Sequence, residues 1–220
     1  MRAGKGKGGR RPPVRVKDRP DVPVLAVVVG AVALALLIGM IGWIVYLNRQ
    51  SSSGGSPTVS GIPCDHLEHS TVHYHAALQI VYHGVTTNLR DNTGIVSDST
   101  GANVNCFYWL HVHPTDKNVI HIESPGNQTF TLGQFFDVWN AWSNQNGYGA
   151  VKLDSKHVAQ FTLQSGDAMI VYIDYGDGKG PQVYTGDPRA IPLKSHEVIT
   201  LEITPPDVNP PPAFTFPSGL

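Results

Sequence analysis

The sequence is poor in sulfur. It has 220 residues with 2 cysteines and 3 methionines, and Met169 is the one methionine that follows residue 47. A Cu(I) carrier needs soft thioether ligands, so the sequence disfavours a methionine-type Cu(I) shuttle. A blue-copper site built on Cys106 and His111 is disfavoured as well, because no methionine lies near them to serve as the usual axial ligand.

Several catalytic motifs are also absent. The sequence contains no CxxC pair, no glycine-rich phosphate loop and no GxSxG elbow. Thioredoxin, nucleotide-dependent and serine-hydrolase chemistries therefore have no support.

Charge is missing from residues 24–47, which read VLAVVVGAVALALLIGMIGWIVYL. A helix of this length is about 36 Å long and spans the roughly 30 Å hydrocarbon core of a bilayer with some tilt. We expect a transmembrane helix over residues 22–47, with Trp43 and Tyr46 at the outer interface. The run is longer than the apolar region of a signal peptide, which favours an uncleaved anchor.

The formal net charge of -1 hides a polarity along the chain. Residues 1–21 carry eight basic and two acidic side chains, whereas the chain from Asn48 onward carries eight basic and fifteen acidic ones. The positive-inside rule predicts a cytoplasmic basic tail at residues 1–21 and an extracytoplasmic remainder, in a single-pass protein of the cell membrane. The net negative charge of the outer part disfavours a nucleic-acid partner.

Low-complexity segments bracket one domain. Residues 48–63 are rich in serine and glycine and predict a flexible linker, and residues 205–220 form a proline-rich tail suited to a protein partner. Between them, residues 64–204 are long enough for an independent core.

The domain reads mostly as strands. Runs rich in β-branched and aromatic residues predict strands at residues 72–82, 107–112, 119–123, 158–163, 169–175 and 198–203. Thr131 and Gln134 form a capping-box pattern that opens one helix. Its apolar stripe, expected to pack on a sheet, comprises Leu132, Phe135, Phe136, Trp139 and Trp142. We expect an α+β fold with a mostly antiparallel sheet, and a β-sandwich or cupin-like barrel is the alternative.

All ten histidines lie between residues 66 and 196, and some share strand faces. Because side chains alternate along a strand, His111 and His113 point to one face. If residues 114–118 form a hairpin loop, His121 lies directly opposite His111, and three imidazoles can then hold Zn²⁺ or Cu²⁺. Glu123, two residues further on, is expected to accept a hydrogen bond from an imidazole and orient it.

A second pair, His73 and His75, has the same spacing and supports this site. His66 and His69 are weaker candidates because they precede a strand, in the segment CDHLEH. A disulfide between Cys64 and Cys106, favoured outside the cell, would draw that segment towards the HVH strand. The three remaining histidines look like turn or surface residues: His83, His157 and His196.

Three functions remain open. One is a membrane-tethered metal-binding module that uses the strand histidines. Another is a metal-dependent hydrolase or hydratase with water in the open coordination position, for which Glu123 and Glu68 are the nearby candidate bases. The last is a structural or assembly module whose histidines are ordinary polar residues on a solvated sheet face.

Several motifs together resemble a family of membrane-anchored, extracytoplasmic, histidine-rich prokaryotic proteins: CDHLEH, VHYHAALQI, CFYWLHVH, IHIESP, LGQFFDVWN and DPRAIPLKSHEVI. That resemblance implies an anchored outer domain and no particular activity. The HxH pair with a third histidine on a neighbouring strand is similar to the zinc site of α-type carbonic anhydrases. Here the third histidine follows after only seven residues, so the likeness implies a ligand arrangement and no shared reaction.

Overall fold

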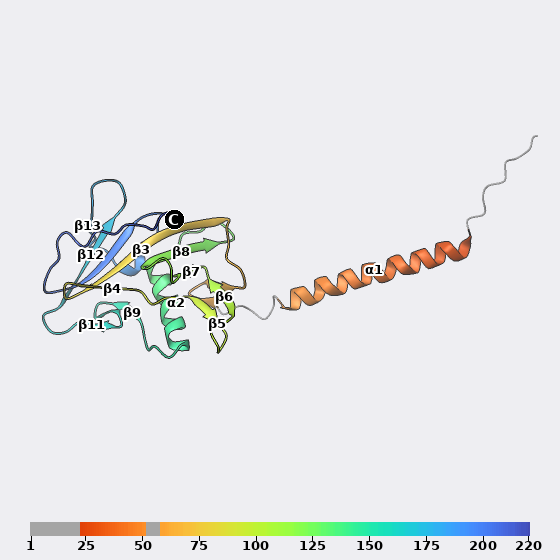
Figure 1. Ribbon diagram of the computed structural model, residues 1–220, viewed down its shortest axis with the longest axis horizontal. Coiled ribbons are helices and arrows are strands. Elements are labelled where there is room, and N and C mark those ends of the chain that lie inside the picture. The colour runs from red at the N-terminus through yellow and green to blue at the C-terminus, as the bar shows by residue number, and fades with distance from the viewer. Residues whose placement is uncertain (1–22, 52–57) are drawn as a thin grey trace, which may run out of the picture. The chain divides into compact units, whose positions relative to one another are not determined.

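Residues 23–51 and 58–220 are described by the computed structural model, in which the chain divides into two compact units, Met1–Gly54 and Gly55–Leu220 (Figure 1). In the first unit, helix α1 spans Val24–Ser51. Its segment Val27–Ile44 is apolar, has no buried residue and is long enough to cross a membrane, as a membrane anchor or a signal sequence would be. The expected basic tail, residues 1–21, lies outside the described residues.

The second unit has the α+β fold that the sequence predicts. It contains helix α2 (Leu132–Gln145) and the short 3₁₀ helix η1 (Pro188–Ala190). Its strands are β1 (Thr58–Val59), β2 (Ile62–Asp65), β3 (Val72–Tyr82), β4 (Val85–Thr87), β5 (Ile95–Ser97), β6 (Val104–Tyr108), β7 (Leu110–His111), β8 (Val119–Ser124), β9 (Lys152–Asp154), β10 (His157–Ala159), β11 (Phe161–Thr162), β12 (Ala168–Asp174), β13 (Gln182–Val183) and β14 (Val198–Thr204).

The largest sheet has the order β13-β12-β14-β3-β8-β7, with β4 beside β3. Its neighbours are antiparallel except for β14 and β3, which run parallel. Two smaller sheets have the orders β1-β2-β6-β5 and β11-β10-β9. The edge formed by β3, β8 and β7 carries the histidine pairs.

Helix α2 packs against β1, β7 and β9 and closes the core beneath this edge (Figure 1). The capping box is present: Gln134 N donates to Thr131 Oγ1 at 3.3 Å, and Thr131 N donates to Gln134 Oε1 at 3.0 Å. The predicted stripe is buried throughout: Leu132, Phe135, Phe136, Trp139 and Trp142. Packing is therefore the role of these aromatic residues.

Two predicted strands are broken. Residues 107–112 are divided at Trp109, because β6 pairs with β2 and β5 whereas β7 pairs with β8 in the large sheet. Residues 158–163 form the hairpin β10–β11, because Ala159 has a φ of 55° and turns the chain. Apolar content alone does not reveal either change of direction.

The expected linker and tail contain ordered contacts. Strands β1 and β2 begin within residues 48–63. In the tail, Val208 N donates to Glu202 Oε1 at 2.6 Å, and residues 210–214 line a cavity of about 200 Å³ together with Gln79 and Thr200 of the large sheet. The tail therefore lies against the sheet, and a protein partner for it stays a prediction.

Candidate metal centre

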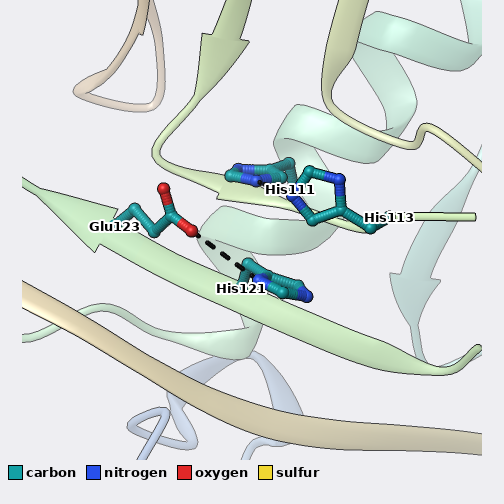
Figure 2. A group of neighbouring side chains, drawn as sticks. All are labelled: His111, His113, His121 and Glu123. Carbon is teal, nitrogen blue, oxygen red and sulfur yellow. Dashed lines mark hydrogen bonds and ion pairs between the residues drawn. The ribbon is translucent and has the colours of Figure 1, made fainter. Parts of the chain in front are cut away.

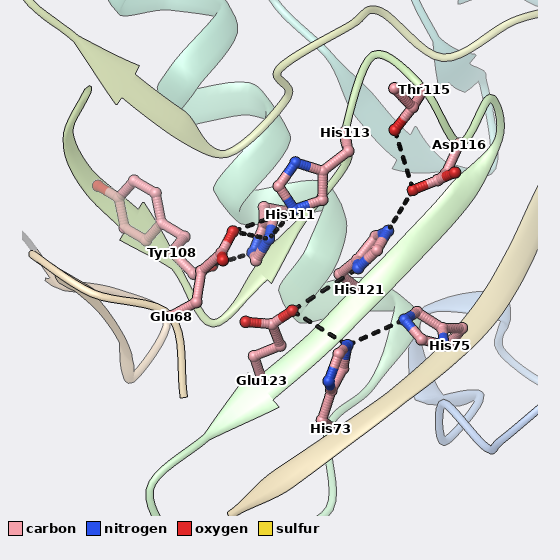
Figure 3. A network of polar contacts seen from close by, with 10 residues as sticks. All are labelled: Glu68, His73, His75, Tyr108, His111, His113, Thr115, Asp116, His121 and Glu123. Atoms are coloured by element: carbon pink, nitrogen blue, oxygen red, sulfur yellow. Dashed lines mark hydrogen bonds and ion pairs between the residues drawn. The ribbon is translucent and has the colours of Figure 1, made fainter. Parts of the chain in front are cut away.

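The histidines meet on one face of β7, β8 and β3. His111 pairs with His121 across β7 and β8, in the register that the hairpin prediction requires. His121 in turn pairs with His75 across β8 and β3, and His73 pairs with Glu123 one step along. Strand pairing thus brings imidazoles from three strands side by side. Figure 2 shows His111, His113 and His121, and Figure 3 shows His73 and His75 as well.

Two groups of residues have ligand atoms that all lie within 4.8 Å of one another. The first is His111, His113, His121 and Glu123; the second is His73, His75 and His121. Each group could hold a metal ion, and His121 belongs to both.

His111 has a fixed tautomer. Its side chain is fully buried, and its Nδ1 lies 2.8 Å from the carbonyl oxygen of Tyr108. A carbonyl oxygen only accepts, so Nδ1–H donates and the lone pair of Nε2 is free. Metal-binding histidines are commonly oriented in this way.

The free nitrogen of His111 lies 3.1 Å from Nε2 of His113. Two ligands bound at about 2.1 Å to one ion are about 3.0 Å apart at a right angle and about 3.4 Å apart at the tetrahedral angle. The spacing also suits a hydrogen bond from His113 Nε2–H to His111. The distance therefore permits coordination without requiring it.

The His121 ring is buried, with 4% of its surface exposed. Among the described residues, neither ring nitrogen has a hydrogen-bond partner. The nearest carboxylate oxygens lie 3.4 Å from Nε2, in Asp116, and 3.6 Å from Nδ1, in Glu123. Buried polar atoms without a hydrogen bond destabilise a folded protein, so among the rings of this cluster His121 would gain the most from binding a metal ion.

Two glutamates supply negative charge (Figure 3). Burial pushes the pKa of Glu123 upward, but the His121 ring and the other imidazoles push it further downward, so it lies below its usual value. The His111 ring lowers the pKa of Glu68, whose Oε1 lies 3.1 Å from His113 Nε2 and 3.5 Å from His111 Nε2. Both carboxylates are therefore ionised and facing imidazoles.

Two of the histidines are held neutral. Burial together with His121 and His73 lowers the pKa of His75 to about 4. Burial and the rings of His111 and His121 lower the pKa of His113 in the same way. A metal ion binds neutral imidazole, so these two rings are already in the charge state that binds metal at neutral pH.

His66 and His69 are not brought into either group. His66 Nδ1 lies 2.7 Å from the carbonyl oxygen of Asn105, and His69 Nε2 lies 2.7 Å from Asp65 Oδ2. The Cys64–Cys106 disulfide is present, with a Cα–Cα distance of 5.3 Å. It draws the CDHLEH segment towards the HVH strand, as expected, but the side chain that reaches the imidazoles is Glu68.

The sequence thus predicts Glu68 only as a candidate base of the alternative hydrolase, and it does not predict Asp116 as a member of the cluster. The signal for Glu68 was the predicted disulfide, which brings its segment close, although no local motif marks the residue. Asp116 lies in the hairpin turn between the paired histidines, where an acidic residue looks like ordinary turn chemistry. Outside the cluster, His157 contacts Asp154 and His196 contacts the carbonyl oxygen of Leu220.

No protein-family model matches this chain, and neither the curated proteins nor the solved structures contain a significantly similar one.

Proposed function

We propose that this protein is a membrane-tethered metal-binding protein whose outer domain takes up Zn²⁺ or Cu²⁺. The observation that carries the proposal is the oriented Nε2 of His111, next to Nε2 of His113. His121 and Glu123 complete a set of four ligands within mutual reach. The ligands are imidazole and carboxylate without sulfur, which suits these two divalent ions better than Cu(I).

The membrane part of the proposal draws on helix α1 and on the flanking charge. The apolar segment Val27–Ile44 has the length of a membrane span, and the basic residues that precede it favour a cytoplasmic N-terminus. This orientation puts the histidine cluster outside the cell, where it would meet metal ions before they reach the membrane.

The test is metal uptake by the full-length, untagged protein in detergent micelles. After exposure to Zn²⁺ or Cu²⁺ and desalting, the wild type is expected to retain the metal in stoichiometric amounts. His111→Ala and His121→Ala should each lose tight binding of the ion held by His111 and His113, with an unchanged circular dichroism spectrum.

His157→Ala is the matched control, because His157 contacts Asp154 away from the cluster. Equal uptake by the wild type and by both cluster variants would reject these ligands. A metal-free wild type would favour the structural or assembly function, and hydrolysis of a model ester that depends on the added metal would favour the hydrolase.

A further inference from the structure

We propose that the cluster is a two-metal centre, in which His73, His75 and Glu123 hold a second ion and the ring of His121 bridges the two ions. This inference rests on the proposed function, since it requires that the His111–His113 side binds metal. It adds two points to that function: the chain binds two ions, and His121 is a ligand of both.

The sheet places two HxH pairs on either side of one ring. His111, His121 and His75 form a row across β7, β8 and β3. The His121 ring centroid lies 4.5 Å from that of His75 and 4.5 Å from that of His113, with edge-to-face angles of 81° and 84°. His121 is therefore equally close to a ring of each pair.

Each pair has its own glutamate. In the second pair, His73 Nε2 lies 3.0 Å from His75 Nε2 and 3.3 Å from Glu123 Oε1. These distances, like those on the first side, are close to the separation of about 3.0–3.4 Å expected for ligands that share an ion.

The first side shows the same arrangement around His111 and His113. Their Nε2 atoms are 3.1 Å apart, and Glu68 Oε1 lies 3.5 Å and 3.1 Å from them, respectively. With two ions bound, Glu68 takes the place of Glu123 on the first side. Each side then offers two imidazoles and one carboxylate, a set that binds divalent transition metals on one face and leaves positions open.

The bridging role follows from the two nitrogens of His121. Both are buried, and neither forms a hydrogen bond within the described part of the chain, so a single bound ion would still leave one of them unsatisfied. Binding of one ion to each nitrogen satisfies both. The ring then gives up its N–H proton to solvent and becomes an imidazolate, so binding of the pair of ions releases one proton from His121.

The charges around the cluster balance two divalent ions. Three carboxyl groups, those of Glu68, Glu123 and Asp116, lie within 3.6 Å of the imidazole nitrogens and can supply three negative charges to bound ions. The imidazolate adds a fourth. Two ions with a total charge of +4 are therefore neutralised, whereas one ion would leave a surplus of negative charge in a largely buried site.

Solvent can reach the centre from both sides. The His73 side chain is 46% exposed and that of Glu68 is 41% exposed, while His111 is fully buried. Ions can thus enter at His73 and at Glu68, and the buried row between them sets their spacing.

The test uses the full-length, untagged protein in micelles, loaded with Cu²⁺ and desalted. The wild type is expected to hold two ions per chain. His73→Ala, a change at an exposed side chain, should hold one ion, and His113→Ala should also hold one. His157→Ala should match the wild type.

Electron paramagnetic resonance of the same samples tests the bridge. Two Cu²⁺ ions joined by an imidazolate couple antiferromagnetically, so the low-temperature signal of the wild type should integrate to well under two spins per chain. The one-ion variants should show their full signal.

One ion per chain in the wild type, unchanged by His73→Ala, would overturn the second site and leave the proposed function standing. Two ions with the signal of two independent spins would overturn the bridge. No retained ion at all would mean that the proposed function itself is wrong.

Discussion

The two HxH pairs have the same spacing and the same strand alternation, yet the fold holds them differently. His111 is fully buried and its Nδ1 is bound to the carbonyl oxygen of Tyr108. His73 is half exposed, and its described polar contacts are with His75 and Glu123. The first pair is pre-organised by the backbone, whereas the second relies on its neighbours' side chains.

The difference also extends to the surrounding chain. The His111–His113 pair faces Glu68, in a segment that the Cys64–Cys106 disulfide ties to β6. The His73–His75 pair adjoins the 194–197 turn, where His196 N donates to the carbonyl oxygen of His75 at 2.7 Å. The same short motif therefore lies in two different surroundings, which are set by residues distant in sequence.

Removing the disulfide should have the largest effect and should separate the two pairs. The bond closes a loop of 42 residues, so Cys64→Ala/Cys106→Ala should lower the free energy of unfolding by about 4 kcal/mol. Chemical denaturation measures this loss. Metal affinity should fall at the His111–His113 side more than at the His73–His75 side, because the segment that carries Glu68 is no longer held by the disulfide. An equal fall at both sides would show that the disulfide does not distinguish the two pairs.

The turn beside His75 should make stability depend on pH. Burial raises the pKa of Glu197 from 4.5 to about 7. Between these values the folded protein keeps a proton that the unfolded chain has lost, so the free energy of unfolding falls as the pH rises through this window. The full shift corresponds to on the order of 3 kcal/mol.

Glu197→Gln removes this titration. The variant should show a flatter denaturation profile between pH 5 and pH 8 and should be the more stable protein at about pH 8. A profile as steep as that of the wild type would exclude Glu197 as the source. Asp154→Asn, at an exposed position, is the control.

Single histidine substitutions compare the pairs directly. His113→Ala should weaken binding of the ion at His111 and His113, here the first ion, by about a hundredfold. Loss of a direct metal ligand should cost at least as much affinity as loss of a residue that only orients a ligand, which costs about 10–100-fold. His73→Ala should leave that ion's affinity within about twofold of the wild type. Calorimetric titration with Zn²⁺ gives both values, and a similar loss in the two variants would show that the pairs form one undivided site.

Glu68→Gln should have the smallest effect. It keeps the shape of the side chain and removes the negative charge that faces His111 and His113, so the first ion should bind about tenfold more weakly. The ion at His73 and His75 should be unaffected. Glu123→Gln is the matched companion, because it should weaken binding of the ion at His73 and His75 instead.

Much of this arrangement could be predicted from the sequence. Strand alternation and a five-residue turn were enough to place His121 opposite His111, and the capping box and aromatic stripe were enough to define α2. These features depend on residues close together in the chain, where periodicity and turn chemistry act.

The parts that could not be predicted depend on contacts between distant segments. The parallel pairing of β14 with β3 and the change of sheet at Trp109 follow from how the whole core packs. Glu68 has no local motif and reaches the cluster through the disulfide, whereas His66 and His69, which have the more suggestive residue type, are held by Asn105 and Asp65. Residue type alone therefore does not show which side chain of that segment reaches the cluster.

Whether His111, His113 and His121 bind one metal ion can be seen directly in an anomalous-difference map. The map would come from crystals of the full-length protein grown with Zn²⁺ and measured at the zinc absorption edge. We predict a peak about 2.0–2.1 Å from Nε2 of His111 and of His113 and in contact with the ring of His121. A map without a peak near these rings, with Nε2 of His111 hydrogen-bonded to Nε2 of His113 instead, would show that the two histidines are not metal ligands.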